Sequence, residues 1–221
     1  MAADMVRPGC VICDIGTDHA YLPSYLILSG RCPSALACDI GKGPLDNARR
    51  SVESLGIADK VTLRLSDGLD EVRPEEADDF VFCGMGGTLM AELISRAEWL
   101  KNPAKAIVAQ PMSHIEDVRK SFIENGFAII KEDVCTDAGH IYACINAVYD
   151  GKKREAAPGF IYYGLLPLLP APEAREYVEG RLQRLVKHRK GIDASGSVEE
   201  KAQLDLIIKD ISEVLGNDFG K

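Results

Sequence analysis

Residues 11 to 23 read Val11-Ile12-Cys13-Asp14-Ile15-Gly16-Thr17-Asp18-His19-Ala20-Tyr21-Leu22-Pro23. The stretch begins as an apolar run of strand length and breaks at Gly16. Beyond the break, apolar residues return at helical spacing, at Leu22, Tyr25, Leu26 and Leu28. A buried strand that turns sharply into a helix opens a doubly wound α/β domain, in which ligands bind outside the carboxyl ends of the strands. We therefore expect residues 14–19 to lie at a ligand site.

The chemistry of this turn differs from that of a dinucleotide-binding turn. A G-x-G-x-x-G fingerprint would let backbone amides approach a pyrophosphate, but this turn has one glycine, two acids and a histidine. Its negative charge opposes phosphate. The turn suits a cationic ligand with hydroxyl and amine groups, and S-adenosylmethionine fits that description.

Length and composition limit the alternatives. The chain has 221 residues, which is enough for one α/β domain and an appendage. No apolar stretch approaches the roughly 20 residues of a membrane span, and no signal peptide is visible, so we expect a cytoplasmic protein without a membrane partner. The net charge of −8 argues against a generally basic surface for nucleic acid.

The cysteines favour a structural role. Cys10 and Cys13 form a C-x-x-C, a spacing that can indicate zinc or redox chemistry. However, residues three apart on a strand point to opposite faces, so one metal could not easily collect both. We interpret the cysteines as small buried hydrophobes and expect no metal.

Apolar runs alternate with helical patterns as far as residue 150, and we take residues 1–150 as one domain. Strands are expected at 11–15, 35–39, 61–65, 79–83 and 105–110, helices at 43–55, 87–100 and 113–125, and an antiparallel pair at 127–134 and 140–149. Strands separated by helices predict a mostly parallel α/β sheet, here with an antiparallel hairpin at its edge.

Residues 151–221 form a second predicted domain. The segment 151–172 looks like a loop with an exposed apolar patch at 160–169. Two helices are expected next, at 172–190 and 198–215, joined by a turn at 191–197. Their apolar stripes are Ala174, Val178, Leu182 and Leu185, and Leu204, Ile208, Ile211 and Leu215. Such stripes predict an antiparallel helical hairpin of the coiled-coil kind.

The first of these helices carries a local basic run on an otherwise acidic chain. Residues 181–190 contain five Lys or Arg and no acid. These charges could complement the helix C-terminus, but that effect is confined to the last turn and does not reach Arg181. Contact with the phosphates of a polyanion is the other interpretation.

Further candidate residues follow the other strands. Asp39 ends the second strand, where a carboxylate can accept bonds from two ribose hydroxyls; an exposed acid at a loop start is the alternative. Asp67-Gly68 could hold an adenine amine and let the ring approach, or could be a simple turn. Gly84-Met85-Gly86-Gly87 indicates a backbone that something approaches closely, or a loop needing positive φ.

Taken together, these motifs resemble the bacterial tRNA (adenine-22, N1)-methyltransferase family. The shared motifs are D-I-G-T-D-H-A-Y-L-P from Asp14, Asp39 followed by G-x-G-P, S-D-G-L from Ser66, G-M-G-G from Gly84, and Q-P at Gln110 and Pro111. The resemblance runs from about Val11 to Tyr149, and the helical hairpin matches the family's C-terminal coiled coil. There are two departures: Met112 stands where the family usually has Asn, and residues 1–9 are too short for the family's first helix.

The resemblance implies a Rossmann-like class I methyltransferase fold, S-adenosylmethionine as cofactor and tRNA as partner. We expect a monomer, although the sequence itself does not determine the oligomeric state. The resemblance places catalysis at Asp18 and His19. Cofactor binding is expected at Asp14, Gly16, His19, Asp39, Asp67, Gly68, Gly84, Met85, Gly86 and Gly87. Substrate binding is expected at Tyr21, Gln110, Pro111, Arg181, Arg184 and Lys187.

The chemistry agrees with a ring nitrogen as acceptor. Adenine N1 has a lone pair and no proton, so methylation needs alignment more than deprotonation. A carboxylate beside N1 and N6, for which we favour Asp18, would bind the cationic transition state better than the neutral base. The [DN]-P-P-[YFW] motif of amine-directed methylases is absent after the fourth strand. The alternatives are a small-molecule methyltransferase, one acting on another RNA site, a noncatalytic RNA-binding module, and a nicotinamide-dependent oxidoreductase.

Overall fold

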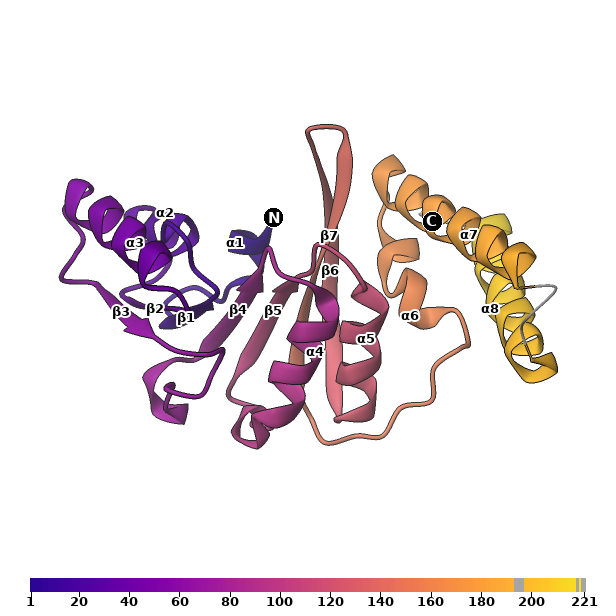
Figure 1. Cartoon of the computed structure of the whole chain (residues 1–221), viewed down its shortest axis with the longest axis horizontal. Coiled ribbons are helices and arrows are strands. Elements are labelled where there is room, and N and C mark those ends of the chain that lie inside the picture. Colours follow the sequence, from indigo (N-terminus) through magenta and orange to yellow (C-terminus); the bar gives the residue numbers. More distant parts are fainter. Residues whose placement is uncertain (193–196, 218, 220–221) are drawn as a thin grey trace. The chain divides into compact units, whose positions relative to one another are not determined.

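The computed structural model describes residues 1–192, 197–217 and 219. The elements up to residue 149 are α1 (Ala2–Met5), β1 (Ile12–Ile15), α2 (Tyr21–Leu28), β2 (Ala35–Asp39), α3 (Lys42–Ser54), β3 (Val61–Leu65), β4 (Asp79–Cys83), α4 (Gly87–Arg96), β5 (Ala106–Gln110), α5 (Ile115–Glu124), β6 (Phe127–Asp137) and β7 (His140–Tyr149). Short 3-10 turns, η1 (Pro74–Glu76) and η2 (Glu98–Leu100), flank β4 and α4. Figure 1 shows this order along the chain.

The strands form one seven-stranded sheet in the order β3-β2-β1-β4-β5-β7-β6. β1 is parallel to both β2 and β4, β2 is parallel to β3, and β4 is parallel to β5, while β7 is antiparallel to β5. The predicted fold class, a mostly parallel α/β sheet with an antiparallel edge hairpin, is confirmed. β1 therefore lies inside the sheet, and its register sets Asp14 opposite Ala37 of β2 and Val81 of β4.

The inner strands are apolar because helices cover the sheet. All four residues of β1 are buried, as are the first four of β2, β4 and β5. α4 and α5 lie side by side against the sheet (Figure 1), and α1 packs on β5 and α2. Asp79, fully buried at the start of β4, accepts hydrogen bonds from the backbone N–H (2.8 Å) and Nε (2.7 Å) of Arg7.

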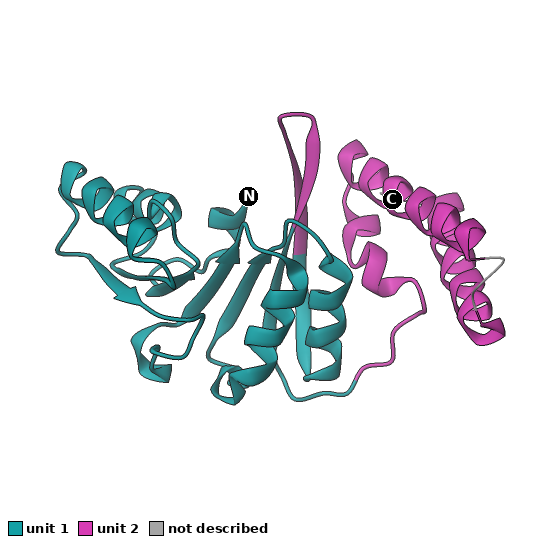
Figure 2. Ribbon diagram, in the orientation of Figure 1, with its two compact units in different colours: residues 1–131, 144–153 teal, residues 132–143, 154–221 magenta. Residues whose placement is uncertain are grey.

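The chain divides into two compact units (Figure 2). The first comprises residues 1–131 and 144–153, and the second comprises residues 132–143 and 154–221. The tip of the β6–β7 hairpin thus belongs with the C-terminal helices. Those are α6 (Phe160–Tyr163), the 3-10 turn η3 (Leu166–Leu168), α7 (Pro172–Gly191) and α8 (Val198–Gly216).

The helix expected after the first strand is present as α2, but the spacing of its apolar residues does not mark its buried face. In α2 the buried residues are Pro23, Ser24, Leu26 and Ile27, whereas Tyr25 and Leu28 are exposed. The cause is that α2 carries no charged side chain, so its apolar spacing does not single out one face.

The apolar patch at residues 160–169 is less exposed than the sequence predicted. It forms α6 and η3 and buries Tyr163 and Leu166, although Leu168 stays exposed. Asp210 of α8 fixes the start of this segment, because its carboxylate accepts from the Gly159 N–H at 2.7 Å and the Tyr163 hydroxyl at 3.3 Å.

The C-terminal helices form the predicted pair. α7 and α8 contact each other, and their buried residues are Ala174, Val178 and Leu185 on one helix and Leu204, Ile207, Ile211 and Leu215 on the other. Two predicted stripe residues, Leu182 and Ile208, are only half-buried, and Ile207 is buried in place of Ile208. Ser197 caps α8 by accepting a hydrogen bond from the Glu200 N–H at 3.0 Å. Residues 193–196 of the expected turn lie outside the described residues.

No helix in the described part of the chain is long and apolar enough to cross a membrane.

Candidate functional site

The turn after β1 is fastened to the end of β2. The backbone N–H groups of Gly16 and Thr17 both donate to the Cys38 carbonyl at 2.9 Å. Gly16 has a φ of +79°, a conformation that glycine adopts without strain. As a result, the acids of the β1 turn and Asp39 at the end of β2 reach the same edge of the sheet.

Asp14 forms the buried floor of this edge. Its side chain is only 7% exposed. Burial raises the pKa of Asp14 to about 6, and the negative charge of Asp39 adds to the rise. The buried hydroxyl of the neighbouring Thr17 acts in the opposite direction and lowers the Asp14 pKa, but the effect of burial is larger. A buried acid with a raised pKa at the end of a strand marks this edge as a candidate ligand site.

Asp39 follows as the second acid. One of its oxygens, Oδ1, accepts the Gly41 N–H at 2.7 Å, which fixes the carboxylate at the start of α3. A Cβ on Gly41 would lie 3.0 Å from Pro44 and 3.1 Å from Asp39, so glycine keeps this turn tight. The G-x-G-P motif therefore positions the acid. Contact of Asp39 with ribose hydroxyls stays a prediction.

The turn after β4 completes the edge. The Gly84 N–H donates to the backbone carbonyl and the side-chain Oε1 of Gln110, at 3.1 and 3.2 Å. The Met112 N–H donates to the Met85 carbonyl at 2.9 Å. A Cβ on Gly16 would lie 2.7 Å from Met85 Cε, so the turns after β1 and β4 touch. The structure thus brings Asp14, Gly16, Asp39, Gly84, Met85, Gln110 and Pro111 to one edge, as the parallel sheet predicted.

At two of the glycines predicted to bind the cofactor, packing within the protein itself requires glycine. A Cβ on Gly68 would lie 2.3 Å from Leu93 of α4, and one on Gly87 would lie 2.2 Å from the His114 carbonyl. The close approach expected at both positions is therefore to the protein itself. Asp67 is exposed after β3. Contact of Asp67 and Gly68 with an adenine ring stays a prediction.

Asp18 and His19 lie at the mouth of the site. The Asp18 side chain is 65% exposed, and its Oδ2 lies 3.5 Å from His19 Nε2. The imidazole stacks on the Tyr21 ring, with centroids 4.9 Å apart and planes 6° from parallel. His19 thus contacts both an acid and an aromatic ring. Its orienting role stays a prediction.

Sequence analysis missed two residues of the site. Asn47 of α3 donates from Nδ2 to Asp18 Oδ1 at 3.3 Å, across 29 positions of sequence. The buried Thr17 hydroxyl lies inside the quoted motif, and its place between the two acids was the available signal. No comparable signal marks Asn47, because only the folded chain brings α3 beside the β1 turn.

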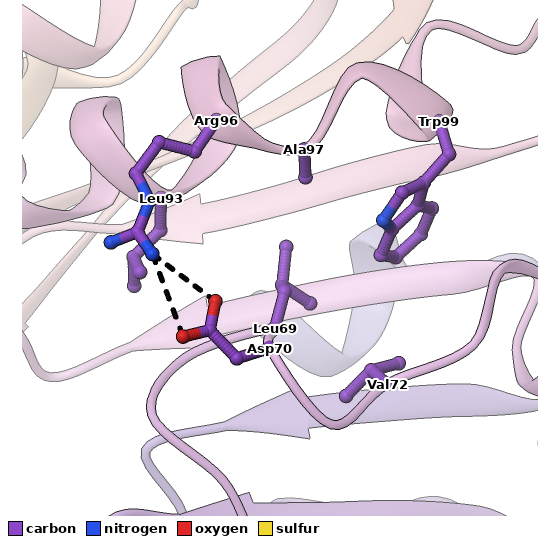
Figure 3. A pocket seen from close by; sticks show the side chains of 7 residues that line it. All are labelled: Leu69, Asp70, Val72, Leu93, Arg96, Ala97 and Trp99. Carbon is purple, nitrogen blue, oxygen red and sulfur yellow. Dashed lines mark hydrogen bonds and ion pairs between the residues drawn. The ribbon is translucent and has the colours of Figure 1, made fainter.

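A separate pocket is lined by the segment after β3, the end of α4 and η2 (Figure 3). It has a volume of about 280 Å³ and is lined by Leu69, Asp70, Val72, Leu93, Arg96, Ala97 and Trp99. Asp70 and Arg96 face each other across it at 3.2 Å. None of the predicted cofactor or catalytic residues lines this pocket, so we do not assign it to the site.

The predicted RNA-contacting residues lie on α7 in the second unit. The Arg181 guanidinium lies 5.7 Å from the centre of the Tyr162 ring, and Arg189 pairs with Asp205 of α8 at 2.8 Å. Arg184 and Lys187 are exposed. Part of the basic run therefore stabilises the helical pair, and part points to solvent.

No group of three or more His, Cys, Asp or Glu side chains in the described residues is arranged to hold a metal ion. Cys13 instead lies 4.0 Å from Cys38 on the adjacent strand, measured between the sulfur atoms. The buried Asp14, the half-buried Asp39 and the lack of a glycine cradle for phosphate suit a cationic ligand with hydroxyl groups.

Comparison with known proteins agrees with this geometry. Residues 1–145 match the family model described as "Methyltransferase domain". The tRNA (adenine(22)-N(1))-methyltransferase of Bacillus subtilis (strain 168) is 32% identical over 156 residues, 67% of this chain and 66% of that protein. The match thus spans just under two thirds of the curated relative's length.

Solved structures are similar over nearly the whole chain. The B. subtilis M1A22 tRNA methyltransferase TrmK has a TM-score of 0.83 at 26% identity, covering 99% of this chain and 95% of that chain. A Streptococcus pneumoniae protein in complex with S-adenosyl-L-methionine has a TM-score of 0.81 at 28% identity, covering 97% and 96%. The chain therefore belongs to the methyltransferases, as its resemblance to the bacterial tRNA (adenine-22, N1)-methyltransferases predicted.

Proposed function

We propose that this chain transfers a methyl group from S-adenosylmethionine to N1 of an adenine in tRNA, at position 22 by resemblance. The observation that carries the proposal is the separation of two acids on one turn. Asp14 is buried at the strand end, while Asp18, four residues later, is 65% exposed at the mouth. One acid is thus placed for a bound cofactor and the other for an incoming substrate.

The buried groups suit S-adenosylmethionine. Its positive sulfonium and amino groups favour the ionised form of Asp14. The free carboxylate oxygen of Asp39 can accept from a ribose hydroxyl while Oδ1 stays bonded to Gly41. When bound, the cofactor would supply a methyl group carried on a sulfonium, from which a neutral thioether leaves.

The exposed groups suit the adenine. Its N1 lone pair attacks the methyl carbon, the carbon–sulfur bond breaks, and its electrons stay on sulfur, which gives S-adenosylhomocysteine. The base then carries a positive charge, and Asp18 stabilises that charge electrostatically. His19 stacked on Tyr21 offers an aromatic surface for the base.

We assign the catalytic role to residues 1–150 and tRNA binding to residues 151–221. The basic side chains of α7 support the second assignment, with Arg184 and Lys187 exposed and Arg181 beside Tyr162. As expected from the sequence, the proposed enzyme acts as a cytoplasmic monomer.

Release of S-adenosylhomocysteine by the full-length protein tests this function. We expect release with unmodified tRNA, and none with adenosine or AMP as acceptor. Asp18→Asn should lower the single-turnover rate by roughly 10²-fold or more and leave cofactor affinity near wild type. Release with the small acceptors would favour a small-molecule enzyme, and tRNA binding without release would favour a noncatalytic module.

A further inference from the structure

Asn47 is the residue that holds the Asp18 carboxylate in the described chain. Its Nδ2 donates to Asp18 Oδ1 at 3.3 Å, and it projects from the second turn of α3. Asp18 itself lies on a turn between β1 and α2, where its side chain is 65% exposed. An exposed carboxylate on a turn is free to rotate unless a neighbour holds it.

Arg50 determines which end of the Asn47 amide faces Asp18. Its Nη2 donates to Asn47 Oδ1 at 2.5 Å, and its Nε donates to the Asp46 carbonyl at 3.3 Å. A side-chain amide has one acceptor end and one donor end. Because the cation takes the acceptor end, the donor end is left facing the carboxylate.

The second oxygen of Asp18 is held from the other side. Oδ2 lies 3.5 Å from His19 Nε2, and the His19 ring is stacked on Tyr21. Asp18 thus lies between an amide on α3 and an imidazole on its own turn. Rigid neighbours of this kind fix a catalytic group within the small tolerance that chemistry requires.

We propose that Asn47 is a positioning residue for methyl transfer, and that Arg50 keeps its amide turned toward Asp18. The inference rests on the proposed function and extends it to two residues of α3. In this proposal Asn47 acts through Asp18. Its loss should therefore lower turnover while leaving the binding of both substrates nearly unchanged.

The variant Asn47→Asp tests the positioning role of Asn47 with a side chain of nearly the same size and shape. The variant replaces the donor with an acceptor and sets a second negative charge beside Asp18. We expect kcat to fall by roughly 10- to 100-fold, the range that displacement of a reacting group by about 1 Å can cause. KM for S-adenosylmethionine and tRNA should stay within about twofold of wild type. Arg50→Ala should lower kcat in the same direction, whereas Arg49→Ala, the adjacent exposed arginine of α3, should not.

A double-mutant cycle separates positioning from independent effects. Asn47→Ala should lower kcat in the wild type but should cause no further loss in Asp18→Asn, because the group it positions is already gone. The exchange variant, Asp18→Asn with Asn47→Asp, can re-form an amide–carboxylate bond with the charge moved to α3. We expect it to melt like wild type and to turn over no faster than Asp18→Asn.

The proposal is overturned if Asn47→Asp keeps the wild-type kcat, or if Asn47→Ala lowers the rate of Asp18→Asn by the same factor as in the wild type. Full activity of the exchange variant would also overturn it, since bonding alone would then suffice. A wild-type protein that releases no S-adenosylhomocysteine with tRNA gives a different result, because the proposed function then fails together with the inference.

Discussion

Gly87 lies directly against the backbone of His114: a Cβ on Gly87 would stand 2.2 Å from the His114 carbonyl oxygen. The Gly87 N–H donates to the Ser113 carbonyl at 2.8 Å, and Gly86 forms an isolated parallel β-bridge with Ser113. The start of α4 is thus joined to the start of α5 without room for a side chain. The close packing places the turns after β4 and β5 side by side at the edge of the sheet.

Gly87→Ala should therefore destabilise the fold. The clash is with backbone, which cannot rotate away, so we expect a loss of about 3 kcal/mol or more in the free energy of unfolding. Gly180→Ala in α7 is the matched control, because a Cβ there meets no atom within 4 Å. It should gain about 0.5–1 kcal/mol as alanine favours the helix. Equal denaturant midpoints for Gly87→Ala and wild type would contradict the packing argument.

Asp39→Ala should weaken S-adenosylmethionine binding. Loss of a hydrogen bond to a charged group costs about 1.5–3 kcal/mol, which corresponds to roughly 10- to 100-fold in Kd. Calorimetry of the full-length protein measures this directly. Asp59→Ala, an exposed acid in the turn before β3, should bind like wild type. Unchanged affinity in Asp39→Ala would remove Asp39 from the cofactor site.

Asp14 should make the stability of the free protein depend on pH. Burial raises its pKa to about 6, above the unfolded value near 3.9. The stability that the protonated acid contributes is fully present below pH 4 and is lost as pH rises through 6. A pKa that is higher by about 2 in the folded than in the unfolded state corresponds to about 3 kcal/mol in the free energy of unfolding.

Asp14→Asn should match wild type below pH 4 and exceed it by up to about 3 kcal/mol at pH 8, measured by denaturant unfolding without cofactor. With S-adenosylmethionine bound, the wild type should be the more stable of the two at pH 8, because the cation favours the ionised Asp14 carboxylate. A difference between wild type and variant that is the same at pH 4 and pH 8 would show that Asp14 does not titrate in this range.

Arg184 and Lys187 should contact tRNA phosphates. Replacing both with alanine should weaken tRNA binding and flatten the slope of log affinity against log salt by roughly 0.7–0.9 for each phosphate that is no longer neutralised. A control with Lys60→Ala and Lys120→Ala removes the same charge from exposed positions outside residues 151–221. If both double variants change the slope equally, the effect is one of net charge and α7 is not the binding surface.

Arg189 should behave differently from these residues. It pairs with Asp205 between α7 and α8, so its charge already has a partner within the helical pair. The basic run read from the sequence thus contains two kinds of residue. Only the structure separates them, because the sequence shows the charges of α7 but not the acid that lies opposite.

The sequence predicted the sheet and the strand-end acids because both follow from local patterns. Short apolar runs mark the strands, and the parallel topology brings their carboxyl ends, with Asp14 and Asp39, to one edge. It could not predict contacts that depend on three-dimensional packing. Asn47 reaches Asp18 across 29 positions, and α2 is too uniformly apolar for its pattern to reveal the buried face.

The position of the methyl group on the base tests the central claim most directly. Unmodified tRNA is incubated with the full-length protein and S-adenosylmethionine, digested at mildly acidic pH to prevent rearrangement, and its nucleosides are separated by liquid chromatography with mass spectrometry. Our account predicts N1-methyladenosine with wild type and strongly reduced N1-methyladenosine with Asp18→Asn. N6-methyladenosine, a methylated nucleoside other than adenosine, or an unmethylated tRNA with wild type would contradict it.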